Sequence, residues 1–332
     1  MATIKDVAAR AGVSTATVSY VINGTGTVTE ATRQRVLTVI AELDYRPNYA
    51  ARSLRTRPRT LGLVLPTLAE RLADPTLAEL VAGLSAGAAE ANYYLLLATV
   101  SQGQSEAELG AQLTLSGRID GLVLFDLRSD DERLGYLQER GVPFICAGRP
   151  AGVDAAYVAF DLVGGAQTAT RHLIAQGHRR IALIDLPSDL ADSEPFFAGY
   201  AAALEAACLE LDPLLTIEAG SSQDDGMAAM LELLDTPEPP TAVLAASDAL
   251  AFGAMHALRD AGIAVGSGIA LIGYGDVPLA AHTHPPLTTL RAQRATMGRE
   301  LAGRLIAQIE GRHHETPGLI LPLHLIVRRS TE

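Results

Sequence analysis

From residue 61 onward, short apolar runs alternate with longer segments in which apolar residues recur at helical spacing. Buried strands are predicted at 61–66, 93–98, 120–125, 142–147, 180–186, 241–247 and 269–275. Helices are predicted between them, at 76–91, 104–116, 131–140, 162–176, 196–210, 224–235 and 248–261. Alternating strands and helices are typical of parallel sheets covered on both faces, so we expect two doubly wound α/β lobes with a seam near residue 161.

The N-terminal segment has a purely helical pattern. Apolar residues over 4–11 fall on one face of a helix, and Gly12 can take the left-handed conformation that ends it. Ser14 is a favoured N-cap for a second helix, and a third is expected from about Thr29. Two short helices joined by a tight glycine turn predict a helix-turn-helix, whose second helix enters the DNA major groove. A helical hairpin that only packs is the alternative.

The charge distribution also separates the helical N-terminal segment from the rest of the chain. The 332 residues carry a net charge of −12, yet residues 1–60 hold nine basic and four acidic groups. Four arginines, at positions 52, 55, 57 and 59, directly precede the first core strand. This asymmetry favours a basic module that meets a polyanion and is joined to an acidic body, although a solvated basic surface would give the same count.

Targeting and redox signals are absent from the sequence. There is no run of 18 apolar residues and no hydrophobic signal region at the N-terminus, so we expect a cytoplasmic protein without a membrane span. Cys146 and Cys208 lie in apolar surroundings and are interpreted as core residues. Nucleotide-binding and nucleophile-elbow motifs are missing, and the paired histidines at 282/284 and 313/314 lack partners at metal-ligand spacing. These observations argue against an enzyme.

Specific segments resemble a known family. "TIKDVAARAGVSTATVSYVING" and "TRQRVLTVIAELDYRPNYAARSL" closely resemble the DNA-binding segment of the lactose-repressor (LacI/GalR) family. "DLVGGAQTATRHLIAQGHRRIALI", "AASDALAFGAMHALRDAGI" and "IALIGYGDVPLAAHTHPPLTTLRAQ" resemble its sugar-binding-protein-like core.

The resemblance implies a domain organisation. An all-α three-helix headpiece (1–47) is followed by a hinge helix and linker (48–59) and by a two-lobed, periplasmic-binding-protein-like α/β domain (60–332) that binds effector and dimerises. Residues near 290–320 would cross back to the first lobe and the C-terminal strand to the second. No cofactor is implied, and the partners would be an operator in double-stranded DNA, a second copy of the chain and a small-molecule effector.

The resemblance and the basic linker together give a set of candidate DNA contacts. In the family the hinge helix enters the minor groove and a leucine, here Leu54, opens the central base step. Physical reasoning agrees, because arginines suit phosphates and a narrow minor groove and an inserted apolar side chain bends the duplex. The expected DNA-binding residues are Thr15, Ala16, Thr17, Ser19, Tyr20, Asn23, Asn48, Arg52, Leu54 and Arg55.

The expected effector site lies at the carboxyl ends of the strands, between the lobes. Its candidate residues are Asp126, Arg128, Arg149, Asp161, Phe196, Ser221, Ser247, Asp248 and Asp276. Asp161 and Asp248 have an alternative role as helix N-caps.

The effector site departs from the family pattern. Phe196 stands where relatives carry an arginine, Gly275 where they carry an acidic residue, and Ser221 where they carry a stacking aromatic. A carbohydrate held differently, with Phe196 as a stacking face, or a more apolar metabolite that uses Phe196 and Leu77 would fit. The function expected is a dimeric repressor that responds to a small molecule, with control by a protein partner and a vestigial cleft as the alternative.

Overall fold

The computed structural model describes residues 2–23, 26–43, 45, 58–66, 74–312 and 317–332. The chain forms two compact units, Met1–Arg57 and Pro58–Glu332. No helix in these described ranges is long and apolar enough to cross a membrane.

The N-terminal unit is the predicted set of three helices, α1 (Ile4–Ala11), α2 (Thr15–Asn23) and α3 (Glu30–Glu42). Gly12 caps α1 with a left-handed φ of 66°, which only glycine adopts without steric cost. The Ser14 hydroxyl accepts a hydrogen bond from the Thr17 amide at 3.1 Å and so caps α2. One small core holds the helices together and consists of Val7, Ala8, Ala11, Val18, Val21, Val36 and Val39.

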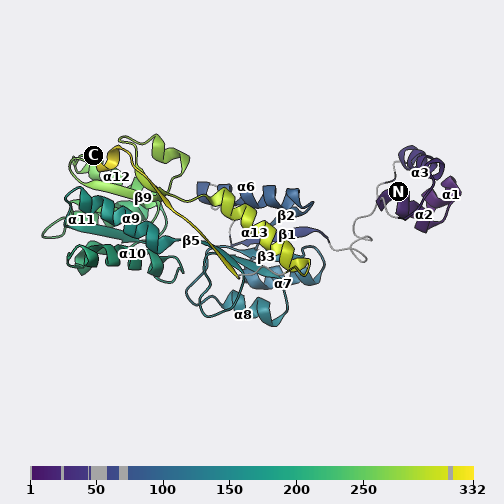
Figure 1. Ribbon diagram of the computed structural model, residues 1–332, viewed down its shortest axis with the longest axis horizontal. Coiled ribbons are helices and arrows are strands. Elements are labelled where there is room, and N and C mark those ends of the chain that lie inside the picture. The colour runs from purple at the N-terminus through teal and green to yellow at the C-terminus, as the bar shows by residue number, and fades with distance from the viewer. Residues whose placement is uncertain (1, 24–25, 44, 46–57, 67–73, 313–316) are drawn as a thin grey trace. The chain divides into compact units, whose positions relative to one another are not determined.

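The first lobe of the second unit is built on a six-stranded parallel sheet (Figure 1). Its strands, in spatial order, are β11 (Gly318–Leu321), β5 (Tyr157–Phe160), β4 (Phe144–Ala147), β3 (Gly121–Leu124), β1 (Thr60–Leu65) and β2 (Tyr94–Thr99). Helices α6 (Pro75–Glu90) and α13 (Arg294–Ile309) pack on one face, and α7 (Glu106–Leu115) and α8 (Glu132–Glu139) on the other.

The second lobe repeats this design. Its strands, in spatial order, are β12 (His324–Ile326), β10 (Thr288–Arg291), β9 (Ala270–Gly275), β8 (Ala242–Ala245), β6 (Ile181–Asp185) and β7 (Thr216–Glu218), and β12 alone among them runs antiparallel to its neighbour. Helices α9 (Leu162–Ala175) and α10 (Ser193–Ala206) cover one face, and α11 (Gln223–Leu234) and α12 (Asp248–Asp260) the other. The fold class expected from the sequence is confirmed.

The chain passes between the lobes after β5, between β10 and α13, and between β11 and β12 (Figure 1). Helix α13 therefore belongs to the first lobe, where it packs closely against α6. Glycine permits this approach, because a β-carbon at Gly298 would lie 2.4 Å from the Leu80 carbonyl oxygen and one at Gly83 would lie 2.1 Å from that of Ala295.

Some sequence expectations were incomplete or wrong. Strands β5, β7, β10 and β11, each three or four residues long, were not predicted, whereas β12 is the C-terminal strand that the family resemblance placed in the second lobe. Cys146 is buried as expected, but Cys208 is exposed, because it follows the end of α10 in a turn with a left-handed φ of 55°.

Candidate functional sites

Helix α2 presents an exposed face opposite its core residues. Thr15, Ala16 and Tyr20 are exposed, and 47% of Tyr20 is open to solvent. Thr17 and Ser19 are half-buried, and the Thr17 hydroxyl lies 2.9 Å from that of Ser14. The first three residues are therefore free to meet base edges, whereas Thr17 also supports the N-terminus of its own helix.

The remaining predicted DNA contacts fall outside what the structure describes. These are the Asn23 side chain and the hinge residues Asn48, Arg52, Leu54 and Arg55.

Between the lobes, a single arginine lies among aromatic rings from both of them. Arg294, the first residue of α13, has its guanidinium carbon 5.7 Å from the ring centroid of Phe160 and 5.4 Å from that of Tyr274. Phe160 ends β5 in the first lobe and Tyr274 lies near the end of β9 in the second. The Arg294 Nε and the Tyr274 hydroxyl are buried; the Nε has no hydrogen-bond partner within the described part of the chain, and the guanidinium lowers the pKa of the neighbouring phenol.

Carboxylates from both lobes surround this arginine. Asp74, the N-cap of α6, and Asp192, the N-cap of α10, both act electrostatically on Arg294. Burial raises the pKa of the Asp192 carboxyl to about 6; Arg294 opposes the rise, and Asp126 from the first lobe adds to it. Asp192 makes no side-chain hydrogen bond to the N-terminus of α10. The carboxylate therefore faces the space between the lobes rather than the helix.

We call Asp126, Asp192, Tyr274 and Arg294, with Phe160, the inter-lobe cluster. Desolvation of a buried polar atom such as the Arg294 Nε is costly unless a hydrogen bond offsets it. Burial also raises the pKa of the Tyr274 hydroxyl to about 12, although Arg294 lowers it, so the phenol remains a hydrogen-bond donor near neutral pH. The cluster thus offers donors, acceptors and ring faces to a polar, uncharged molecule.

Asp276 has a different setting from the one expected. Its carboxylate accepts from Arg291 on one oxygen and from Arg328 on the other, each at 2.6 Å, and only 4% of the side chain is exposed. This ion-pair network joins the end of β9 to β10 and to the C-terminal segment. Each oxygen of Asp276 thus has an arginine partner and, as a carboxylate oxygen, can still accept a further hydrogen bond.

Three other candidates stabilise helix starts and loops. Asp161 caps α9 by accepting from the Gly164 amide at 3.0 Å, and Ser247 caps α12 by accepting from the Leu250 amide at 3.1 Å. Asp248 is buried and accepts from the Val277 amide at 2.8 Å.

The remaining candidates lie on the surface or in the core. Arg149 and Ser221 are exposed, and Arg128 forms an ion pair across the lobes with Asp189. Phe196 is 2% exposed and packs behind Tyr274, with ring centroids 5.7 Å apart. Leu77 is fully buried in the first lobe and cannot contact a ligand. The structure thus brings Asp126 and Phe196 to the inter-lobe cluster, and the Asp248 carboxylate is close enough to act electrostatically on Tyr274.

The sequence analysis missed Phe160, Asp192, Tyr274 and Arg294. Their positions in the sheets could have pointed to three of them. Phe160 ends β5, Tyr274 lies near the end of β9 and Arg294 follows β10, and ligands of such sheets bind at strand ends. Nothing in the local sequence of Asp192 distinguishes it from an ordinary helix cap.

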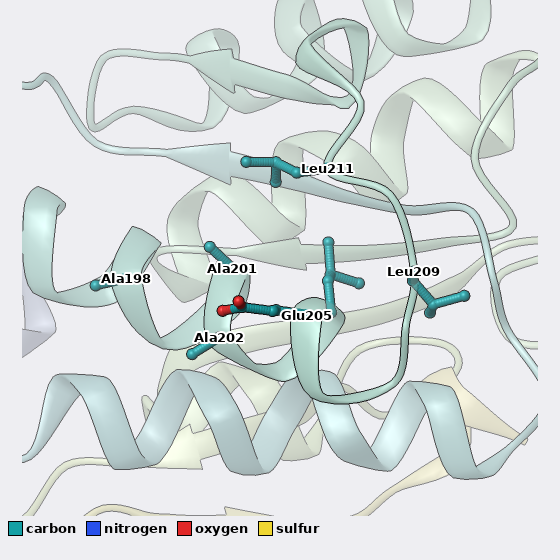
Figure 2. Close-up of a pocket in the computed structure, with 7 residues that line it drawn as sticks. Ala198, Ala201, Ala202, Glu205, Leu209 and Leu211 are labelled. Atoms are coloured by element: carbon teal, nitrogen blue, oxygen red, sulfur yellow. The ribbon is translucent and has the colours of Figure 1, made fainter.

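A separate hollow lies on the outer side of α10 (Figure 2). It is lined by alanines of α10, by Glu205 and by Leu209 and Leu211 of the following segment. Glu205 is its only charged lining residue, so the hollow offers no converging polar groups. Metal chemistry has no support either, since no group of three potential ligands occurs in the described ranges.

Comparisons with known proteins identify the family of this chain. Residues 3–48 match the family model described as bacterial regulatory proteins, lacI family, and residues 170–331 match the periplasmic binding protein-like domain. The transcriptional regulator CelR of Thermobifida fusca is 41% identical over 99% of this chain and 98% of its own length. The transcriptional repressor CytR of Escherichia coli (strain K12) is 31% identical over 99% of this chain and 96% of its own.

Solved structures give the same picture. A CelR–cellobiose complex has a TM-score of 0.77 at 39% identity and covers 99% of this chain and 100% of that one. A lac repressor dimer bound to operator and the anti-inducer ONPF has a TM-score of 0.89 at 27% identity, with 99% of each chain covered. These relatives are transcriptional regulators and not enzymes. The chain therefore belongs to the LacI family of DNA-binding transcriptional regulators, with an N-terminal helix-turn-helix and a periplasmic-binding-protein-like core.

Proposed function

We propose that this regulator is a cytoplasmic repressor that binds a palindromic operator as a homodimer and changes its operator affinity when a β-linked disaccharide such as cellobiose binds at the inter-lobe cluster. The observation that carries the effector assignment is the buried Arg294 Nε, which has no hydrogen-bond partner among the described residues and lies beside the Tyr274 hydroxyl and the Asp192 carboxylate. The cellobiose complex of CelR supports the choice of sugar, because that protein resembles this chain over its whole length.

The chemistry of a neutral saccharide matches these groups. Each sugar hydroxyl both donates and accepts, so Asp126 and Asp192 would accept while Arg294 and Tyr274 would donate. Hydrogen bonds to charged groups are the stronger kind, which gives the arginine and the carboxylates most of the binding free energy. A phosphorylated sugar would meet a surplus of carboxylates, so we expect it to bind more weakly than the neutral disaccharide.

Calorimetry of the full chain with cellobiose tests the effector assignment. Arg294→Ala should weaken binding by about 10- to 100-fold, since a hydrogen bond to a charged group contributes about 1.5–3 kcal/mol. Arg171→Ala, which removes an exposed arginine from α9, is the matched control and should bind as the wild type does. Equal binding by wild type and Arg294→Ala would show that the sugar binds elsewhere. No binding of any saccharide by the wild type would favour control by a partner protein.

The operator is tested separately. Two copies of α2 related by a twofold axis require inverted half-sites, and the exposed Ala16 offers only apolar contact, which favours a thymine methyl group. Selection from a random DNA pool should therefore return inverted repeats. Recovery of single half-sites without symmetry would contradict the dimeric arrangement, whatever the effector is.

A further inference from the structure

Two loops from opposite lobes bind one another beside the inter-lobe cluster. The loop after β3 and the loop after β6 form an antiparallel bridge between Arg128 and Leu190. The Ser129 amide donates to the Asp189 carbonyl at 2.8 Å, and the Ala191 amide donates to the Leu127 carbonyl at 2.9 Å.

Side chains add to this bridge. The Ser129 hydroxyl donates to the Ser188 carbonyl at 3.2 Å, and the Arg128 guanidinium forms an ion pair with the Asp189 carboxylate. Ala191 also packs against the apolar core of the first lobe. We call these contacts between residues 127–129 and 188–191 the lobe latch.

The first-lobe side of the latch is held rigidly. The Asp131 carboxylate accepts from the Arg128 amide at 3.2 Å and is itself paired with Arg133. Arg133 donates to the Phe125 and Asp126 carbonyls, at 3.2 and 2.9 Å. Contacts within the first lobe therefore hold the backbone between the end of β3 and the lobe latch in place, independently of the second lobe.

Each latch loop carries one carboxylate of the cluster. Asp126 directly precedes the first loop, and Asp192 directly follows the second. The two negative charges disfavour each other, because Asp126 adds to the raised pKa of Asp192. Closure of the lobes therefore carries an electrostatic cost that other contacts must offset.

We propose that the lobe latch holds the two lobes closed and so brings Asp126 and Asp192 together, which makes Arg128 and Asp189 positioning residues for the effector. The part of this proposal that concerns the effector rests on the proposed function. An effector whose hydroxyl groups donate to both carboxylates would relieve their repulsion and act in the same direction as the latch. An open latch lowers the fraction of molecules competent to bind, and the apparent affinity falls in proportion.

Charge reversal gives the sharpest test, because it acts on the ion pair and leaves the backbone bonds possible. The side chains of Arg128 and Asp189 are 62% and 55% exposed, so neutralising one charge would change affinity by only about two- to fivefold. Arg128→Asp or Asp189→Arg replaces attraction by repulsion and should raise the Kd for cellobiose roughly 5- to 20-fold. The double variant restores the attraction and should return to within about twofold of the wild type.

Amide hydrogen exchange supplies a measurement that needs no effector. The amides of Ser129 and Ala191 donate across the lobes, so each single reversal should speed their exchange and the double variant should slow it again. Arg312→Asp is the matched control, because Arg312 pairs with Glu310 at 2.7 Å on an exposed surface within one lobe. This control should change neither the exchange at Ser129 and Ala191 nor the Kd.

The outcomes separate the two proposals. Unchanged exchange in both single variants overturns the latch. Faster exchange with wild-type cellobiose affinity, or a double variant that fails to recover, overturns the positioning role. If the wild type binds no saccharide, the proposed effector is wrong, and recovery of slow exchange in the double variant still decides whether the latch holds the lobes closed.

Discussion

Replacing Asp192 by asparagine tests how far the burial of a carboxylate in the inter-lobe cluster lowers the free energy of unfolding. The substitution keeps the shape of the side chain and removes its charge. No helix cap is lost, because Asp192 makes no side-chain hydrogen bond to α10. We therefore expect Asp192→Asn to stabilise the core near neutral pH and to weaken effector binding. Such opposite effects on stability and function are common at binding sites.

The size of the effect follows from the pKa. Burial raises the pKa of Asp192 from 3.8 to about 6. A difference of about two units corresponds to about 3 kcal/mol at about 1.36 kcal/mol per unit, and this net value already includes the attraction to Arg294.

The sign of the pH dependence is fixed by the direction of the shift. The Asp192 carboxyl binds its proton more tightly in the folded state than in the unfolded state. Well below pH 3.8 it is protonated in both states, so its burial does not lower the free energy of unfolding. Stability that is present at low pH is lost as pH rises from about 4 to about 6, and the loss is complete above that range. The variant should therefore exceed the wild type at pH 8 and keep only about a third of this advantage at pH 4.5.

Urea unfolding of the full chain, followed by circular dichroism at both pH values and at one protein concentration, measures the difference. Asp154→Asn, which alters an exposed carboxylate in a loop, is the control and should differ little from the wild type at either pH. The comparison must be between variants, because burial also raises the pKa of Asp185 to about 6 and gives the wild type a second contribution of the same sign. A variant less stable than the wild type at pH 8, or a gap independent of pH, would refute the reasoning.

Three further predictions concern other parts of the molecule. Gly298→Val should destabilise the core by at least about 2 kcal/mol in urea unfolding, because its β-carbon would lie 2.4 Å from a carbonyl oxygen of α6, and an unchanged midpoint would contradict the close packing of α6 and α13. Asp248→Ala should cost about 2–4 kcal/mol in the same assay by leaving the Val277 amide and the Thr289 hydroxyl without their acceptor, and a loss below about 0.5 kcal/mol would mean that water replaces it. Leu54→Ala should lower operator affinity while non-specific DNA binding persists in a gel-shift assay; equal operator affinity would reduce the hinge to a tether.

The helices of the headpiece could be predicted closely because their determinants are local. Gly12 ends α1 and Ser14 caps α2, as the sequence indicated, and both effects depend on residues at most four positions away. The strands of the core were predicted where an apolar run was long. Short strands such as β7 and β10 were missed because pairing with neighbours, and not a long apolar run of their own, makes them strands.

The candidate site residues stay predictions, and Asp276 illustrates what the sequence could not show about them. The sequence offers a carboxylate at the end of a strand, which is a reasonable ligand position. The structure surrounds it with Arg291 and Arg328, which are near it only because β10 and the C-terminal segment lie beside β9. The two arginines hold the carboxylate in one orientation, and a carboxylate oxygen with one partner can still accept a second hydrogen bond, so its role as an effector ligand stays a prediction.

The sequence by itself determined the helix-turn-helix, the alternation that produces two parallel sheets, and the family, since periodicity, capping and turn chemistry act over a few residues. Only the tertiary structure decided which groups meet between the lobes. Asp126, Asp192, Tyr274 and Arg294 come from four elements spread over 169 positions, and no local pattern relates them. They converge because the strand ends of both sheets face the same space and because the chain crosses into α13 at Arg294, so their shared burial and electrostatics exist only in the folded core.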